Sequence, residues 1–364
     1  MANDDLGSAK KAKNDEFYTQ YADIEKEMNA YLEYNPEIFK GKTILLPCDD
    51  PEWSNFTKYF AQNFETFGLK KLISTSYAPN SKPKDIPYQP ALFELEDDKF
   101  DETKTQSNGK IFTLTRDVTG DQRINVDDLE WTYLDGTGDF RSKEIKALRD
   151  EADIIVTNPP FSLFREFLVW IVEAEKSFVI VGNQNAITYK EVFPLISANK
   201  IWLGKGFTRS MAHFYTPYVP HSKWIEQEGE HVVRVAGVQW FTNLEHGKRH
   251  QPLPLMTMAD NIRFSKHKEV QGSEYKTYDN YDAIEVPFTD AIPSDHDGVM
   301  GVPITFLTKY SPEQFEIHGS QRWGKSAEIQ KAYRGSKTFD TDMKTLIQGK
   351  ETYDRIFIKH RRIS

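Results

Sequence analysis

The chain has 364 residues, of which 38% are hydrophobic and 13% aromatic, and it carries a formal net charge of -9 at pH 7. No apolar run approaches the roughly 18 residues that a membrane span needs, and the first residues lack the regions of a signal peptide, so we expect a cytoplasmic protein without membrane contacts. The single cysteine, Cys48, excludes an intramolecular disulfide and a multi-cysteine zinc site, and we expect it to be a small buried residue.

The first part of the chain predicts a strand, turn and helix unit. Residues 1–13 are small, polar and charged without periodicity, and we expect a flexible arm there. Apolar residues at helical spacing predict a helix over residues 22–33. The short apolar run at 43–46 predicts the first strand, which ends in a turn at 47–51 before an amphipathic helix. A second strand is predicted at residues 71–76.

Strands and helices continue to alternate after an irregular polar stretch that contains several prolines. The sequence predicts strands at 111–115, 129–134, 153–157, 177–181 and 201–203, and helices at 142–149, 162–173 and 190–197. This alternation predicts an α/β fold with a mostly parallel sheet and helices on both faces. The alternation ends near residue 205. Strand-like runs at 232–242 and 301–309 are expected to close the sheet and to pass into a second, smaller domain.

The tetrapeptide Asn158-Pro159-Pro160-Phe161 directly follows the apolar run at 153–157. Ligands of open α/β sheets bind outside the carboxyl ends of the strands, so this position is that of a catalytic loop. Two consecutive prolines fix two φ angles and remove two backbone donors, and the loop therefore presents carbonyl groups rigidly. The Asn158 side-chain oxygen and the Pro159 carbonyl can accept both N–H bonds of a conjugated amine and aim its lone pair at an electrophile. Phe161 offers an apolar face on which an extruded base can stack.

An Asn-Pro-Pro sequence can also be a simple turn that ends a strand, and its context decides between the two interpretations. Here the chain resembles the amino-methyltransferases that use S-adenosylmethionine (SAM) and carry an (Asn/Asp/Ser)-Pro-Pro-(Phe/Tyr) motif. Within that group it is similar to the adenine-specific DNA methyltransferases of the EcoRI modification methylase family. The segments that carry the resemblance are residues 15–20, 48–51, 55–56, 155–165, 187–193, 201–204 and 298–307.

The resemblance implies a Rossmann-like SAM-dependent methyltransferase sheet and a set of residues that bind SAM. Phe17, Tyr18 and Thr19 match the motif that lies against the methionine end of SAM. Pro47 and Asp49 occupy the first strand-to-helix turn, which lacks the usual glycine-rich G-x-G loop. Asp49 is expected to contact the cofactor, with helix capping by Asp49 or Asp50 as the alternative. Asp139 matches the acid that binds the adenine amine of SAM, and Phe140 matches its stacking neighbour; an ordinary loop before a helix is the alternative.

The order of the motifs resembles the class of these enzymes that places target recognition at the C-terminus. We therefore expect a flexible arm at 1–13, a catalytic domain at 14–245 and a target-recognition region at 246–364. Basic runs at 246–268 and 355–364 are compatible with double-stranded DNA as the partner, although the whole chain is acidic. Aromatic and basic residues of this region are candidates either for DNA contacts or for the core: Tyr275, Tyr278, Tyr281, Arg322 and Trp323. We expect a monomer, with a cognate restriction endonuclease as a possible counterpart.

Two other classes remain open at this point. Related enzymes with the same tetrapeptide modify a glutamine amide in protein or a guanine amine in ribosomal RNA, and a non-catalytic SAM-binding or DNA-binding homologue is the second alternative. The sequence shows no phosphate-binding loop of the G-x-x-x-x-G-K type, and its nine histidines show no spacing typical of a metal site, so we expect SAM and no metal.

Overall fold

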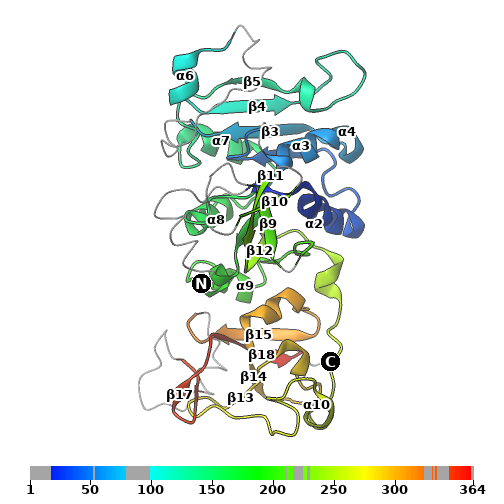
Figure 1. Ribbon diagram of the computed structural model, residues 1–364, viewed down its shortest axis with the longest axis vertical. Coiled ribbons are helices and arrows are strands. Elements are labelled where there is room, and N and C mark those ends of the chain that lie inside the picture. The colour runs from blue at the N-terminus through cyan, green and yellow to red at the C-terminus, as the bar shows by residue number, and fades with distance from the viewer. Residues whose placement is uncertain are drawn as a thin grey trace. The chain divides into compact units, whose positions relative to one another are not determined.

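The computed structural model describes residues 18–51, 54–78, 99–209, 211–215, 224–227, 230–323, 330, 333 and 344–361. The chain divides into two compact units, which are described separately here (Figure 1). The first consists of Met1–Gln184 and Gly204–Leu244, and the second of Asn185–Leu203 and Glu245–Ser364. The expected arm at 1–13, the candidate Phe17 and the polar stretch at 79–98 lie outside the described residues.

The central sheet of the first unit has its strands in the order β5-β4-β3-β2-β6-β7-β12. Neighbours from β3 to β7 pair in parallel, whereas β4, β5 and β12 are antiparallel to the strands beside them. The predicted fold class is confirmed, but the sheet is mixed at both edges. The strands span Thr43–Leu46 (β2), Lys71–Ser76 (β3), Lys110–Leu114 (β4), Glu130–Tyr133 (β5), Ile154–Thr157 (β6), Ser177–Asn183 (β7) and Val238–Thr242 (β12).

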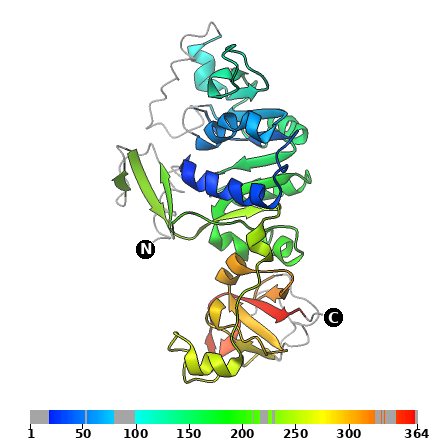
Figure 2. The same cartoon turned by 90° about the vertical axis from the view of Figure 1, so that its right-hand side faces the viewer.

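Continuous apolar runs explain why the central strands were predicted with accurate bounds. All residues of β2 and β6 are buried, as expected for strands covered on both faces by helices. Helices α2 and α3 lie on one face of the sheet, and α7 and α8 lie on the other (Figures 1 and 2). The helices span Tyr21–Tyr34 (α2), Asn55–Gln62 (α3), Phe64–Phe67 (α4), Glu102–Ser107 (α6), Val126–Asp128 (η2), Lys143–Glu151 (α7) and Phe164–Val172 (α8).

A second, antiparallel sheet stands apart from the central one in the first unit (Figure 2). Its order is β1-β9-β11-β10, with Tyr18–Thr19 (β1), Ala212–Tyr215 (β9), Trp224–Gln227 (β10) and Glu230–Val235 (β11). The single strand expected at 232–242 is therefore wrong. Gly237 adopts a φ of 68° and turns the chain between β11 and β12, so the two halves of the run join different sheets.

The second unit is built around a sheet with the order β13-β14-β18-β15. Its core contains Tyr278, Tyr281, Val299 and Phe357, so the two tyrosines are core residues rather than surface candidates. Strands and short helices span Gln184–Thr188 (η3), Phe193–Ser197 (α9), Trp202–Leu203 (β8), Gly247–His250 (η4), Met258–Phe264 (α10), Ala283–Glu285 (β13), Thr289–Ala291 (η5), Val299–Pro303 (β14), Ile304–Lys309 (η6), Phe315–Ser320 (β15), Leu346–Ile347 (β16), Lys350–Glu351 (β17) and Arg355–His360 (β18).

Residues 185–203, which we expected inside the catalytic domain, group with the second unit. The indole Nε1 of Trp323 donates a 2.9 Å hydrogen bond to the carbonyl of Thr188, and the Arg249 guanidinium lies 3.8 Å from the centre of the Trp202 ring. These two contacts join residues 185–203 to the part of the chain that follows residue 245. In the part of the chain that the structure describes, no helix meets the length and hydrophobicity of a membrane span.

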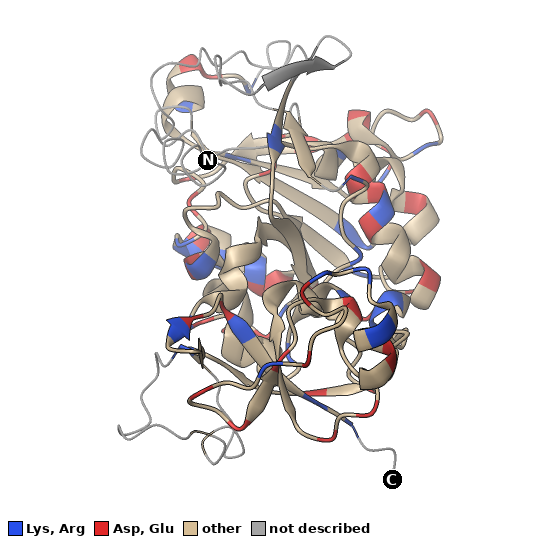
Figure 3. Ribbon diagram, turned by 60° about the horizontal axis from the view of Figure 1, so that its bottom comes forward, with Lys and Arg blue, Asp and Glu red and all other residues tan. Residues whose placement is uncertain are grey.

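Basic and acidic side chains are interspersed in both units (Figure 3). Several cations of the basic runs in the second unit are paired with carboxylates instead of standing alone: Arg249 with Glu245, Lys266 with Asp290, Arg355 with Glu285 and Arg361 with Glu316. These cations of the predicted DNA-binding region therefore form ion pairs within the second unit.

Candidate active site

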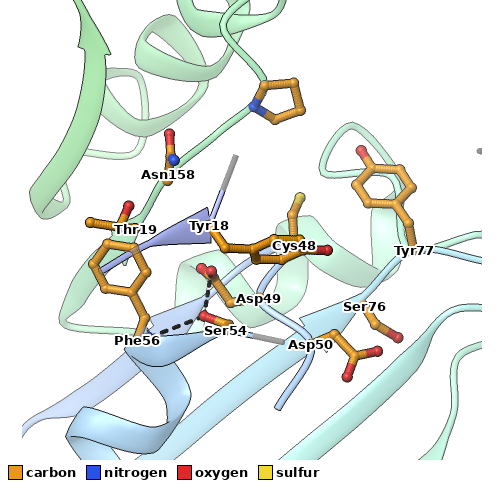
Figure 4. A pocket seen from close by; sticks show the side chains of 11 residues that line it. Tyr18, Thr19, Cys48, Asp49, Asp50, Ser54, Phe56, Ser76, Tyr77 and Asn158 are labelled. Carbon is orange, nitrogen blue, oxygen red and sulfur yellow. Dashed lines mark hydrogen bonds between the residues drawn. The ribbon is translucent and has the colours of Figure 1, made fainter. Parts of the chain in front are cut away.

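A pocket lies at the carboxyl ends of β2 and β6, next to β1 (Figure 4). This is the edge of an α/β sheet at which ligands bind. The pocket brings together five of the expected site residues: Tyr18, Thr19, Asp49, Asn158 and Pro160. Its lining is completed by residues that were not expected at the site: Cys48, Asp50, Ser54, Phe56, Ser76 and Tyr77.

The turn after β2 has a left-handed backbone although it contains no glycine. Cys48 has a φ of 67°, a conformation that costs an L-residue about 1–2 kcal/mol. The Cys48 amide donates a 3.3 Å hydrogen bond to the Thr75 hydroxyl at the end of β3. Cys48 was expected to be a small buried residue, but it is half-buried and lines the pocket. The chain thus makes the sharp turn that a glycine-rich loop usually makes, with a cysteine in the strained position.

Asp49 is the buried acid of the pocket, with 5% of its surface exposed. Burial raises the pKa of Asp49 to about 7, and hydrogen bonds from Thr157 and Ser54 offset only part of that shift. The Ser54 hydroxyl lies 2.8 Å from Asp49 Oδ1. Ser54 also caps α3, because its hydroxyl accepts a 3.1 Å hydrogen bond from the Phe56 amide. The alternative that Asp49 or Asp50 caps this helix is therefore wrong.

Thr19 belongs to β1 and faces the pocket from the second sheet of the first unit. Its carbonyl accepts a 2.8 Å hydrogen bond from the Asn55 side chain, which fixes β1 against the start of α3. The Thr19 hydroxyl is buried and has no hydrogen-bond partner among the described residues. A buried hydroxyl without a partner costs free energy, so a ligand that hydrogen-bonds with it is favoured here.

The Asn158-Pro159-Pro160-Phe161 turn begins where β6 ends. The Thr157 hydroxyl donates a 2.8 Å hydrogen bond to the carbonyl of Pro47, which joins the carboxyl ends of β6 and β2. Pro47 and Pro159 are themselves buried, whereas Asn158 and Pro160 line the pocket. The Phe161 ring is half-buried and packs edge-to-face on Phe214 of β9, at a centroid distance of 6.3 Å.

Asp139 follows a tight glycine turn beside the end of β3. Arg141 holds its carboxylate with two hydrogen bonds, Nε to Oδ1 at 2.9 Å and Nη2 to Oδ2 at 2.6 Å, and these bonds lower the pKa of Asp139. The Phe140 ring is buried against Phe167 and Trp170. A ring enclosed in the core presents no face to a ligand, so the structure does not support the expected stacking role of Phe140.

Three of the residues that sequence reasoning missed lie at or just after two strand ends. Cys48 lies just after β2, Ser76 is the last residue of β3, and Tyr77 follows it. Burial raises the pKa of Tyr77, so its hydroxyl stays protonated at neutral pH. The signal that would have found them is position alone, because parallel strands bring their carboxyl ends to one edge of the sheet.

The pocket suits SAM on two observations. The Thr19 hydroxyl is buried without a hydrogen-bond partner among the described residues, and Asp49 is a buried acid whose ionised form a cationic ligand would favour. Among the described residues, no group of three or more histidine, cysteine, aspartate or glutamate side chains is placed to hold a metal ion. A mixed α/β sheet with this pocket and an Asn-Pro-Pro-Phe turn at its strand ends defines an amino-methyltransferase.

Comparison with known proteins identifies the family. The model of the family described as adenine-specific methyltransferase EcoRI matches residues 5–361. The chain is 40% identical to the type II methyltransferase M.EcoRI of Escherichia coli over 98% of this chain and 97% of that protein. It is 34% identical to M.MpnI of Mycoplasma pneumoniae over 85% of this chain and 83% of that protein. It is 35% identical to M.MgeORF184P of Mycoplasma genitalium over 85% of this chain and 84% of that protein. No solved structure matches the chain significantly.

The chain belongs to this family of adenine-specific DNA methyltransferases, and it is an enzyme. Membership in the family decides against the protein, ribosomal RNA and non-catalytic alternatives. Membership in a methyltransferase family implies in general that SAM is the methyl donor.

Proposed function

We propose that the protein transfers a methyl group from SAM to the exocyclic N6 amine of an adenine that has been flipped out of double-stranded DNA at a specific site. One observation carries this proposal: Asn158 of the catalytic turn lines the same pocket as Thr19 and Asp49. A base held at the turn and a cofactor held in the pocket would therefore be neighbours. Such proximity supplies much of the rate enhancement in a direct displacement.

The catalytic turn is proposed to bind the adenine. The Asn158 side-chain oxygen and the Pro159 carbonyl accept the two hydrogens of the amine, which draws the nitrogen towards tetrahedral geometry and directs its lone pair. Pro160 holds the turn rigid, because its carbonyl accepts a 2.9 Å hydrogen bond from the Leu163 amide. Phe161 supplies a face for stacking, and extrusion of the base is needed because the amine is inaccessible in a duplex. Bound SAM supplies the electrophilic methyl group on a sulfonium.

The opposite side of the pocket is proposed to bind the cofactor. The Thr19 hydroxyl donates to the methionine carboxylate, with Phe17 and Tyr18 as its neighbours in sequence. Asp49, in its ionised form, faces the cationic part of SAM, and Pro47 shapes the turn that carries it. At the adenine end of SAM, the Asp139 carboxylate accepts a hydrogen bond from the adenine amine.

The region at 246–364 is proposed to recognise the DNA target, with the catalytic domain at 14–245. Cations at the surface of α10 and the loop after it support this assignment. Arg263 lies over the ring of Phe264, 4.9 Å from its centroid, and 59% of Phe264 is exposed. Arg263 and Lys268 are exposed as well. An exposed aromatic ring beside cations is typical of surfaces that contact nucleic acid. We propose that the enzyme acts as a monomer and that a cognate restriction endonuclease shares its site.

The test is methyl transfer from labelled SAM to DNA by the purified protein and by the Asn158→Ala variant. We expect label on adenine with the wild type, and a loss of at least about a hundredfold with Asn158→Ala, because a removed transition-state acceptor costs about that much. Isothermal titration should show that Asn158→Ala still binds SAM. Label on protein or RNA with unlabelled DNA would contradict the proposal. Mapping of N6-methyladenine in DNA from cells that express the protein would give the target sequence.

A further inference from the structure

Helix α2 carries three side chains that hold one loop of the first unit by its backbone. Asp23, Lys26 and Glu27 lie on the same face of α2, at spacings of three and four residues. Glu27 Oε1 accepts a 2.9 Å hydrogen bond from the Lys205 amide, and Glu27 Oε2 accepts one of 2.9 Å from the Gly206 amide. Lys26 Nζ donates to the Phe207 carbonyl. Asp23 Oδ1 accepts a 2.7 Å hydrogen bond from the Thr208 amide.

Glu27 is the central residue of this set, which we call the α2 clamp. Its side chain is fully buried, and the Tyr31 hydroxyl donates a further 2.6 Å hydrogen bond to its Oε1. A buried carboxylate is tolerated only when its oxygens accept hydrogen bonds, and here both do. The fit is tight, because a Cβ atom on Gly204 would lie 1.9 Å from Glu27 Oε1. Glu27 therefore fixes residues 205 and 206 in one place.

The clamped loop carries the start of an aromatic chain that ends at the catalytic turn. Phe207 stacks on Trp240 of β12, with ring centroids 5.3 Å apart and planes 19° apart. Phe207 also packs edge-to-face on Phe214, at 6.0 Å, and Phe214 packs edge-to-face on Phe161, at 6.3 Å. Such ring pairs are directional as well as apolar, so the position of Phe207 constrains the next two rings.

We propose that Glu27 is a positioning residue for methyl transfer: by fixing the loop at 205–208 it sets Phe207 and Phe214, and through them the ring of Phe161 on which the adenine stacks. This inference rests on the proposed function. Glu27 touches neither adenine nor cofactor, and it does not line the cofactor pocket. Loss of the Glu27 carboxylate should therefore disturb the stacking and methylation of the target adenine and leave the binding of SAM unchanged.

The chain offers a matched pair of variants. Glu27→Gln places an NH2 group against the Lys205 or Gly206 amide, because the carboxylate accepts through both oxygens. Asp23→Asn removes the same charge from the same helix, but both hydrogen bonds from Thr208 go to Oδ1, which the asparagine keeps. Both variants remove one negative charge, but only Glu27→Gln removes an oxygen that accepts a hydrogen bond from the loop. A difference between the two variants therefore reports on the lost hydrogen bond and not on the lost charge. Gly204→Ala, which should push the Glu27 carboxylate aside, is an independent variant that leaves Glu27 itself unchanged.

The experiment measures four quantities. They are the single-turnover rate on DNA that the wild type methylates, the fluorescence of 2-aminopurine in place of the target adenine in the same DNA sequence, the Kd for SAM, and the hydrogen exchange of amides 205–208. We expect Glu27→Gln and Gly204→Ala to exchange these amides faster, to slow methyl transfer about tenfold or more and to weaken the 2-aminopurine signal, since misplacement of about 1 Å has effects of this size. Both should keep the Kd for SAM within about twofold, and Asp23→Asn should stay within about twofold of the wild type throughout.

Two results would overturn the proposal. One is a Glu27→Gln rate and fluorescence equal to those of Asp23→Asn despite faster amide exchange at 205–208. The other is a parallel loss of SAM affinity, rate and melting temperature, which would mean a general structural role. A wild-type protein that methylates no DNA would contradict the proposed function itself, and that result differs from an active wild type that is insensitive to Glu27→Gln.

Discussion

The Ser54 hydroxyl lies 2.8 Å from Asp49 Oδ1 and also accepts a hydrogen bond from the Phe56 amide, so one serine joins the buried acid of the pocket to the first turn of α3. The acid remains difficult to ionise in spite of this donor. Its pKa of about 7 compares with the ordinary value of 3.8, and burial is the main cause. The position of Asp49 at the cofactor pocket therefore has a consequence for the dependence of both stability and binding on pH.

We predict that the contribution of Asp49 to the free energy of unfolding falls as the pH rises from about 4 to about 7. The folded protein holds the Asp49 proton over this range and the unfolded chain does not, so folding becomes less favourable as protons are removed. Asp49→Asn should remove this dependence, so its effect on the free energy of unfolding should be more favourable at about pH 8 than at about pH 5.5, by about 2 kcal/mol. The same variant should bind SAM more weakly, because it lacks the carboxylate.

Thermal unfolding at the two pH values and titration with SAM check this prediction together. Ser54→Ala removes both the helix cap and the donor to Asp49, so it should cost about 1 kcal/mol at about pH 5.5 and more at about pH 8, where Asp49 is ionised. Equal pH profiles for the wild type and Asp49→Asn would show that Asp49 does not titrate in this range.

The single cysteine gives a second prediction, which concerns backbone strain. Cys48 has a φ of 67°, so Cys48→Gly should relieve strain, whereas Cys48→Ala should keep it. We expect the glycine variant to be more stable than the alanine variant by about 1 kcal/mol in urea unfolding. Both variants should retain methyl transfer, because no catalytic step is assigned to the thiol. A glycine variant less stable than the alanine variant would contradict the strained turn.

Alkylation of the same thiol reports on the pocket. Cys48 is the one cysteine of the chain and lines the pocket, so a maleimide has one target there. We expect SAM at saturating concentration to slow labelling several-fold in the wild type, while Cys48→Ala takes up no label. Labelling that is indifferent to SAM would place the cofactor elsewhere.

Two glycines before Asp139 form a matched pair for a third prediction. A Cβ atom on Gly138 would lie 2.3 Å from the Ser76 carbonyl, and the φ of Gly138 is 85°. A Cβ atom on Gly136 would meet no atom within 4 Å. Gly138→Ala should therefore push the Asp139 loop away from the end of β3 and weaken the binding of SAM about tenfold or more, whereas Gly136→Ala should change it little. Calorimetric titration of both variants checks the difference, and equal Kd values would contradict a role of the Asp139 loop in cofactor binding.

A buried ion pair in the second unit gives the fourth prediction. Arg355 Nε lies 2.9 Å from Glu285 Oε1, the Tyr278 hydroxyl donates to the same carboxylate, and both charged side chains are at least nine-tenths buried. Arg355→Met leaves the carboxylate buried without its cation, and we expect a loss of about 3–5 kcal/mol in urea unfolding. The double variant Arg355→Met with Glu285→Gln should recover part of that loss. Additive losses would mean that the two residues do not interact.

The sequence by itself determined the class of the fold and the position of the chemistry. Strands such as β2, β3 and β6 are short apolar runs that end at polar turns, and burial between two helical layers makes such runs apolar throughout. The Asn158 turn could be located for the same reason, since two prolines stop a buried strand at one defined residue.

Only the tertiary structure decided which distant segments meet. The run at 232–242 looked like one strand, because alternation of side chains does not say which sheet a strand joins, and a turn at Gly237 sends its halves to different sheets. Residues 185–203 joined the second unit, and Tyr278 and Tyr281 became core, through contacts far apart in sequence. Cys48, Ser54, Ser76 and Tyr77 became lining of the pocket for the same reason. Pairing between strands and packing between rings depend on the whole chain, whereas strand formation depends largely on the local pattern of apolar residues.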